Sequence, residues 1–136
     1  EGSQHMKAAK FLVYAAGLFF VLYGVAFALF PVTLSVWVTG GSPSTSSGVI
    51  DLRATYGGMS VAVGAILLIL GFHGEWISLG VWAIAIVLLA MAATRILGII
   101  LDGSPNLVMY IYLAAELLFA SLALYLRSHA QDGNAT

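Results

Sequence analysis

Two ionisable residues interrupt apolar segments of this chain, so their chemistry has to be accounted for first. Arg95 lies in the apolar stretch 77–101, and Glu116 lies in the apolar stretch 107–126. A charge at the centre of a membrane span costs about 3 kcal/mol even on the most lenient scale, so both side chains should face inward and have a partner. Together they could form a buried ion pair, or they could hold a polar ligand or an ion.

Further polar residues should lie at the same depth or nearer to the same membrane surface. Asp102 follows Arg95 by two helical turns and shares its face, with Gly98 between them. Arg53 opens the apolar stretch 52–72. The predicted site is therefore a cluster of charged and aromatic side chains: Arg53, Tyr56, Arg95, Asp102, Tyr112 and Glu116.

Each of these residues also has a purely structural interpretation. The Arg95–Glu116 pair could only fix the register of two helices, and Arg53 could extend to lipid head groups. The tyrosines could belong to the aromatic belt at the membrane interface. Small residues recur at helical spacing and predict close helix packing, which is their commonest role in membranes: Gly57, Ser60, Gly64, Gly71 and Gly98.

No motif for catalysis accompanies the predicted site. The sequence has no cysteine, no HExxH pattern and no serine with a plausible base. An enzyme is therefore the least favoured class, and we expect neither a cofactor nor a metal. Five basic and six acidic residues sum to −1, which leaves no basic surface for nucleic acid.

The composition places the chain in a membrane. Of its 136 residues, 61% are hydrophobic and 8% are charged, against about 25% charged in soluble domains. Apolar stretches long enough to cross a bilayer occupy about 11–30, 52–72, 77–101 and 107–126. The predicted fold class is all-α, an integral membrane four-helix bundle.

The connections have the composition of turns and loops. Pro31 interrupts the first stretch, and residues 32–38 either continue that helix past a kink or lie in the membrane interface with Trp37 as an anchor. Residues 39–48 are rich in Gly, Ser and Thr and predict a loop. Residues 73–76 and 102–106 are short enough to be tight turns.

One transmembrane domain, residues 7–127, accounts for nearly all of the chain. Residues 1–6 resemble the remnant of an expression tag followed by a start methionine, and residues 128–136 form a polar tail. Lys7 and Lys10 precede the first span and Arg127 follows the last. The positive-inside rule therefore predicts that both termini, with the polar tail, are cytoplasmic and that the charged cluster is in the extracytoplasmic half.

Several of these residues carry a resemblance to a known family. The string Asp51-Leu-Arg-Ala-Thr-Tyr-Gly-Gly58, the segment Arg95-Ile-Leu-Gly98 leading to Asp102-Gly103, and Glu116 resemble the pattern of the DUF4345 family. The similarity covers about residues 10–126. It implies a four-span bundle in a bacterial inner membrane and supplies no activity. The matching positions are Arg53, Tyr56, Gly57, Gly58, Arg95, Asp102, Gly103 and Glu116.

Two functions remain open beside the least favoured class, a membrane-embedded enzyme. In the first, the charged cluster binds or transports a small anionic or amphipathic ligand between the helices. In the second, the protein is a structural or accessory membrane subunit whose ion pair only fixes helix packing. The expected partners are membrane lipids, and transport by so short a chain would require a homo-oligomer, at least a dimer.

Overall fold

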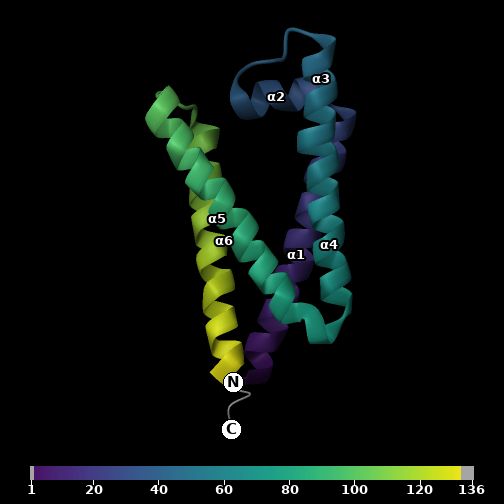
Figure 1. Ribbon diagram of the computed structural model, residues 1–136, viewed down its shortest axis with the longest axis vertical. Coiled ribbons are helices and arrows are strands. Elements are labelled where there is room, and N and C mark those ends of the chain that lie inside the picture. The colour runs from purple at the N-terminus through teal and green to yellow at the C-terminus, as the bar shows by residue number, and fades with distance from the viewer. Residues whose placement is uncertain (1, 133–136) are drawn as a thin grey trace.

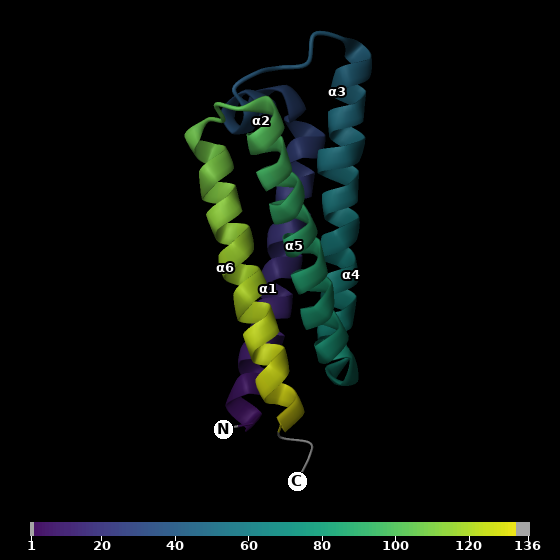
Figure 2. The same ribbon diagram turned by 60° about the vertical axis from the view of Figure 1, so that its left-hand side comes forward.

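The computed structural model describes residues 2–132, with side chains to residue 129. The elements follow the chain as α1 (Gly2–Leu29), α2 (Pro31–Thr39), α3 (Ser46–Leu52), the π-helical segment η1 (Arg53–Met59), α4 (Ser60–Phe72), the 3₁₀ turn η2 (Gly74–Trp76), α5 (Ile77–Asp102) and α6 (Leu107–Asp132). Figures 1 and 2 show the long helices running up and down between two ends of the molecule.

Four helical stretches among the described residues are long and apolar enough to cross a membrane. They are Gly2–Leu29, Ser46–Phe72, Gly74–Asp102 and Leu107–His129. Each has at least 23 residues, and about 20 are needed to span the hydrocarbon core. The predicted all-helical membrane fold is confirmed. α1 begins inside the segment 1–6, and α6 continues past the predicted end of its span; the last four residues of the predicted tail, 133–136, lie outside the described part.

A short helix lies across one end of the molecule. Phe30 precedes a proline and leaves the helical region (φ −125°, ψ 53°), which ends α1 and lets α2 start at Pro31 in a new direction. Gly40 ends α2 with φ 83°, a left-handed conformation that suits glycine. Figure 1 shows α2 transverse to α1, which favours the interfacial alternative for residues 32–38.

Asn106 ties this short helix to the last span. Its Oδ1 accepts a hydrogen bond from the Met109 backbone N–H at 3.2 Å, which caps the start of α6. Its Nδ2 donates to the Val38 carbonyl at 3.0 Å. The turn between α5 and α6 is therefore fixed to α2 at the same end of the bundle.

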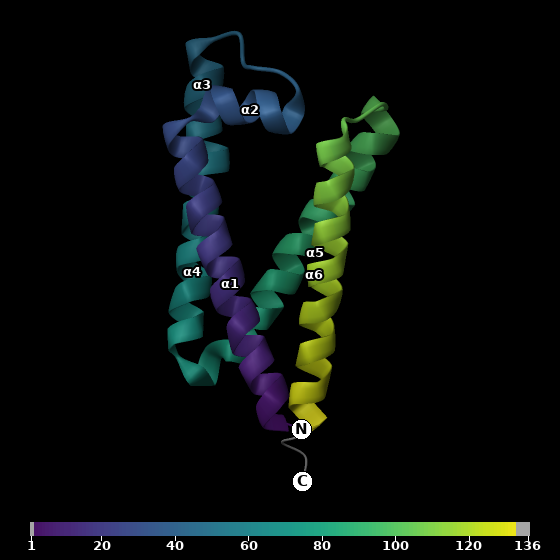
Figure 3. The same ribbon diagram turned by 180° about the vertical axis from the view of Figure 1, so that it is seen from behind.

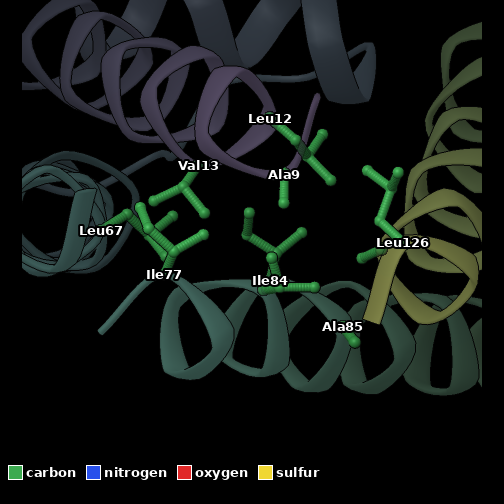
Figure 4. Close-up of a cluster of buried hydrophobic side chains, with 10 residues drawn as sticks. Ala9, Leu12, Val13, Leu67, Ile77, Ile84, Ala85 and Leu126 are labelled. Atoms are coloured by element: carbon green, nitrogen blue, oxygen red, sulfur yellow. The ribbon is translucent and has the colours of Figure 1, made fainter. Parts of the chain in front are cut away.

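The hydrophobic core lies at the opposite end, near both termini. All four spanning helices contribute buried side chains to it, as Figure 4 shows: Ala9, Leu12, Val13, Leu67, Ile77, Val81, Ile84, Ala85, Ala123 and Leu126. From this end the α1–α4 pair and the α5–α6 pair diverge toward the end that carries α2 (Figures 1 and 3). Arg95 and Asp102 of α5 and Glu116 of α6 lie beyond this core along their helices, toward the end that carries α2.

Glycines bring α1 and α4 into backbone contact. A Cβ added at Gly64 would lie 2.5 Å from the Gly17 carbonyl oxygen, and one added at Gly24 would lie 2.5 Å from the Gly57 carbonyl oxygen. The two contacts recur at seven-residue intervals on antiparallel helices. Small residues permit this close approach in lipid, where packing rather than burial from water drives helix association.

Candidate functional site

A buried ion pair joins α5 to α6. Arg95 Nη2 lies 2.5 Å from Glu116 Oε1, and Arg95 Nε donates to both carboxylate oxygens at 3.1 and 3.0 Å. The Glu116 side chain is 6% exposed and the Arg95 side chain 17% exposed. The pairing expected from the cost of buried charge is therefore present, and its several hydrogen bonds fix the guanidinium in one orientation.

The guanidinium keeps donors that the carboxylate does not use. Arginine has five N–H groups. One on Nε and one on Nη2 point to Glu116, and one on Nη1 contacts the Met109 sulfur at 3.2 Å. A thioether is a weak acceptor that a better one could replace. Arg95 can therefore offer two or three N–H groups to an oxyanion without losing Glu116.

Arg95 lines a pocket at the α5–α6 turn. The pocket has a volume of about 280 Å³, close to the lower limit for small-molecule sites. Two charged residues, apolar side chains and two glycines surround it: Arg95, Asp102, Ile99, Pro105, Met109, Gly98 and Gly103. The mixture of apolar walls with a few convergent polar groups is typical of a binding site.

Asp102 lines this pocket without a partner of its own. Among the described residues, Arg95–Glu116 is the only salt bridge within 4.0 Å, and no hydrogen bond to the Asp102 carboxylate occurs. Asp102 is also the last residue of α5, where the helix dipole disfavours a negative charge. Arg95 and Asp102, which the sequence places on one face of the helix, thus line the same pocket but do not form a salt bridge with each other.

Aromatic side chains connect the ion pair to the other helix pair. The Arg95 guanidinium lies 5.2 Å from the centre of the Tyr112 ring, and the Tyr112 hydroxyl donates to the Tyr23 hydroxyl at 3.4 Å. Tyr23 packs against Phe27, whose ring stacks on Tyr56 with centroids 5.1 Å apart. The predicted residues Tyr56 and Tyr112 therefore lie at the two ends of one aromatic row across α1.

Arg53 does not join the cluster that the sequence predicted. Its Nη1 donates to the carbonyl of Ala28, in the last turn of α1. The carbonyls at the end of a helix lack partners within the helix, and a cation there also complements the helix dipole. The correction is that Arg53 caps α1 instead of supplying an extra cation to the pocket.

The predicted packing residues divide into two groups. Gly57 of η1 and Gly64 of α4 lie in close contact with α1, and Gly71 makes ordinary contacts with Val13 and Tyr14. A Cβ at Gly98 would meet only Asp102 Oδ2, at 3.8 Å. Gly98 therefore does not pack against another helix and instead leaves space in the pocket. Ser60 begins α4, at the end of the π-helical segment.

Sequence reasoning missed the residues of the first span that complete the arrangement. Tyr23 and Phe27 link the two helix pairs, and Gly17 and Gly24 supply half of the glycine contact. The spacing of Phe19, Tyr23 and Phe27, four residues each, was the signal that could have revealed an aromatic face.

One comparison with known proteins gave a match. The model of a family described as "Domain of unknown function (DUF4345)" matches residues 8–127. No curated protein and no solved structure matches the chain.

Proposed function

The chain belongs to the DUF4345 family, whose description names no function, and on the geometry of the pocket we propose that it binds an amphipathic ligand in the membrane. The observation that carries this proposal is the pocket at the α5–α6 turn, which is lined by Arg95, a residue that keeps N–H groups not used by Glu116. Glu116 acts as a positioning residue that holds the Arg95 guanidinium. The Arg95–Glu116 pair therefore both joins the two helices and orients the group that binds the ligand.

The polar group of the ligand would enter the pocket, while its apolar part stays outside. A volume of about 280 Å³ suits a head group and is too small for a whole lipid. Ile99 and Met109 supply apolar walls. Among the ligands named from the sequence, an amphipathic one is favoured over a purely anionic one, because Arg53 does not add its charge to this site.

The proposed location is a bacterial inner membrane with both termini in the cytoplasm. The cations Lys7, Lys10 and Arg127 at the chain ends support this orientation. The pocket would then open in the extracytoplasmic leaflet, at the level of the lipid head groups.

Filling the pocket should abolish binding without unfolding the protein. Gly98→Leu places a side chain in the pocket, and its Cβ has no close neighbour. The purified parent should melt several degrees higher with saturating dihexanoyl phospholipid, because a ligand at a hundred times its Kd stabilises by about 3 kcal/mol. The melting temperature, followed by tryptophan fluorescence, should not rise for Gly98→Leu.

Gly58→Leu is the matched control. An added Cβ there meets nothing closer than the Arg53 carbonyl at 4.0 Å, and Gly58 is not among the residues that line the pocket. This variant should respond to the phospholipid like the parent. An equal response of Gly98→Leu and Gly58→Leu would rule out the pocket as the binding site and leave the accessory-subunit alternative.

A further inference from the structure

The charged residues at the pocket carry a net negative charge when the described salt bridge and hydrogen bonds are taken into account. Arg95 is neutralised by Glu116, and Arg53 is directed to the end of α1. Asp102 then remains as a carboxylate without a counter-charge on the pocket wall. The sum of Arg95, Glu116 and Asp102 is −1, so a purely anionic ligand would be repelled overall, although Arg95 offers it hydrogen bonds.

Asp102 is exposed at the end of α5, so its carboxylate is accessible to a cationic group of a ligand. A carboxylate at the C-terminal end of α5 faces the negative end of the helix dipole, and no basic residue lies in the last turn of α5 to compensate. Asp102 Oδ2 lies above Gly98, the residue whose missing side chain leaves space between Asp102 and Arg95. A positively charged group in that space would contact the carboxylate directly.

From this arrangement we infer that the ligand carries both charges: an ammonium group for Asp102 and a phosphate for Arg95. This inference rests on the proposed function and specifies its ligand as a zwitterionic phospholipid of the phosphoethanolamine type. The ammonium N–H groups donate to the carboxylate, and the phosphate oxygens accept from the free Arg95 N–H groups. The ammonium group is then paired with Asp102, and the phosphate shares the Arg95 guanidinium with Glu116.

The order of Arg95 and Asp102 along the helix matches the order of the two charges in such a lipid. Arg95 precedes Asp102 by seven residues, about 10 Å along the helix axis, and Asp102 is next to the turn at the end of the bundle. In a phosphoethanolamine lipid the phosphate is nearer to the acyl chains and the ammonium group is farther out. The deeper cation of the protein thus faces the phosphate, and the shallower carboxylate faces the ammonium group.

The inference is tested by measuring the affinity of the detergent-solubilised protein for four probes. They are dihexanoyl phosphatidylethanolamine, dihexanoyl phosphatidylglycerol, decylamine and soluble O-phosphoethanolamine. The parent should bind the phosphatidylethanolamine about tenfold more tightly than either of the two singly charged amphiphiles, because only it offers both an ammonium group to Asp102 and phosphate oxygens to the free Arg95 N–H groups. It should bind the soluble head group more weakly, since that lacks the apolar part.

Asp102→Asn should remove the selectivity. The variant should lose about tenfold in affinity for phosphatidylethanolamine and gain for phosphatidylglycerol, since the repelling charge is gone. Asp51→Asn is the control, because it makes the same change in net charge on an exposed residue that does not line the pocket. It should behave like the parent.

The outcomes separate this inference from the proposed function. If the parent bound phosphatidylglycerol or decylamine as tightly as phosphatidylethanolamine or more tightly, the inference of a zwitterionic ligand would be wrong. The proposed function would still hold, provided that Gly98→Leu blocked binding. If O-phosphoethanolamine bound as tightly as phosphatidylethanolamine, the ligand would still carry an ammonium group and a phosphate, but it would not be a lipid. Binding that Gly98→Leu leaves unchanged would overturn the proposed function itself.

Discussion

Glu116→Leu should be the most damaging single change at the ion pair. It leaves the Arg95 guanidinium in an apolar setting without its carboxylate, and removing one partner of a buried pair typically costs about 3–5 kcal/mol. Arg95→Leu should cost less, because an orphaned carboxyl group can take up a proton whereas a guanidinium stays charged. The melting temperature in detergent, read from the three tryptophans, gives the ranking.

The double variant Arg95→Leu, Glu116→Leu is the decisive comparison. It leaves no buried charge, so it should melt above Glu116→Leu despite carrying one more substitution. A double variant that melts below both single variants would show that the two side chains stabilise the bundle independently, which is incompatible with the pair described above.

Gly64→Ala should separate α1 from α4. The added methyl group would meet the Gly17 carbonyl oxygen at 2.5 Å and the Val21 backbone nitrogen at 2.6 Å, so a helix has to move. Overpacking a well-packed site costs about 1–3 kcal/mol, and a clash with backbone atoms belongs at the upper end. The expected result is a large drop in the melting temperature, or failure to purify as a folded monodisperse species.

Alanine substitutions at two other glycines should give smaller losses of stability, and the three can be compared. Gly17→Ala mainly meets the Leu68 side chain, at 2.9 Å, so it should cost less than Gly64→Ala. Gly58→Ala has open space and should leave the melting temperature unchanged or slightly higher. If Gly58→Ala were as damaging as Gly64→Ala, helix propensity rather than close packing would explain the glycines.

The spans and the ion pair were predictable because they follow from local properties. Twenty apolar residues suffice to identify a span, and the cost of a charge in lipid requires Arg95 and Glu116 to find partners. The glycines of the α4 stretch were equally visible as a stripe of small residues. No knowledge of which helix packs against which was needed for these conclusions.

The partners across helices were not predictable in the same way. Arg53 reaches the carbonyl of Ala28 only because Gly57 lets α1 approach closely, and this depends on which helix α1 packs against. The aromatic row through Tyr23 and Phe27 depends on the same pairing. A single sequence shows which residues share a face of a helix but not which helix packs against that face. For this reason the sequence alone assigns Arg53 to the charged cluster and not to the end of α1.

Binding of a zwitterionic lipid in the pocket is tested directly by a crystal structure grown in a lipid mesophase doped with phosphatidylethanolamine. We expect head-group density in the α5–α6 pocket, with the phosphate on Arg95 and the ammonium group on Asp102, and Glu116 still bound to Arg95. A pocket closed by a direct Arg95–Asp102 contact, or lipid density confined to the outer faces of the helices, would contradict it.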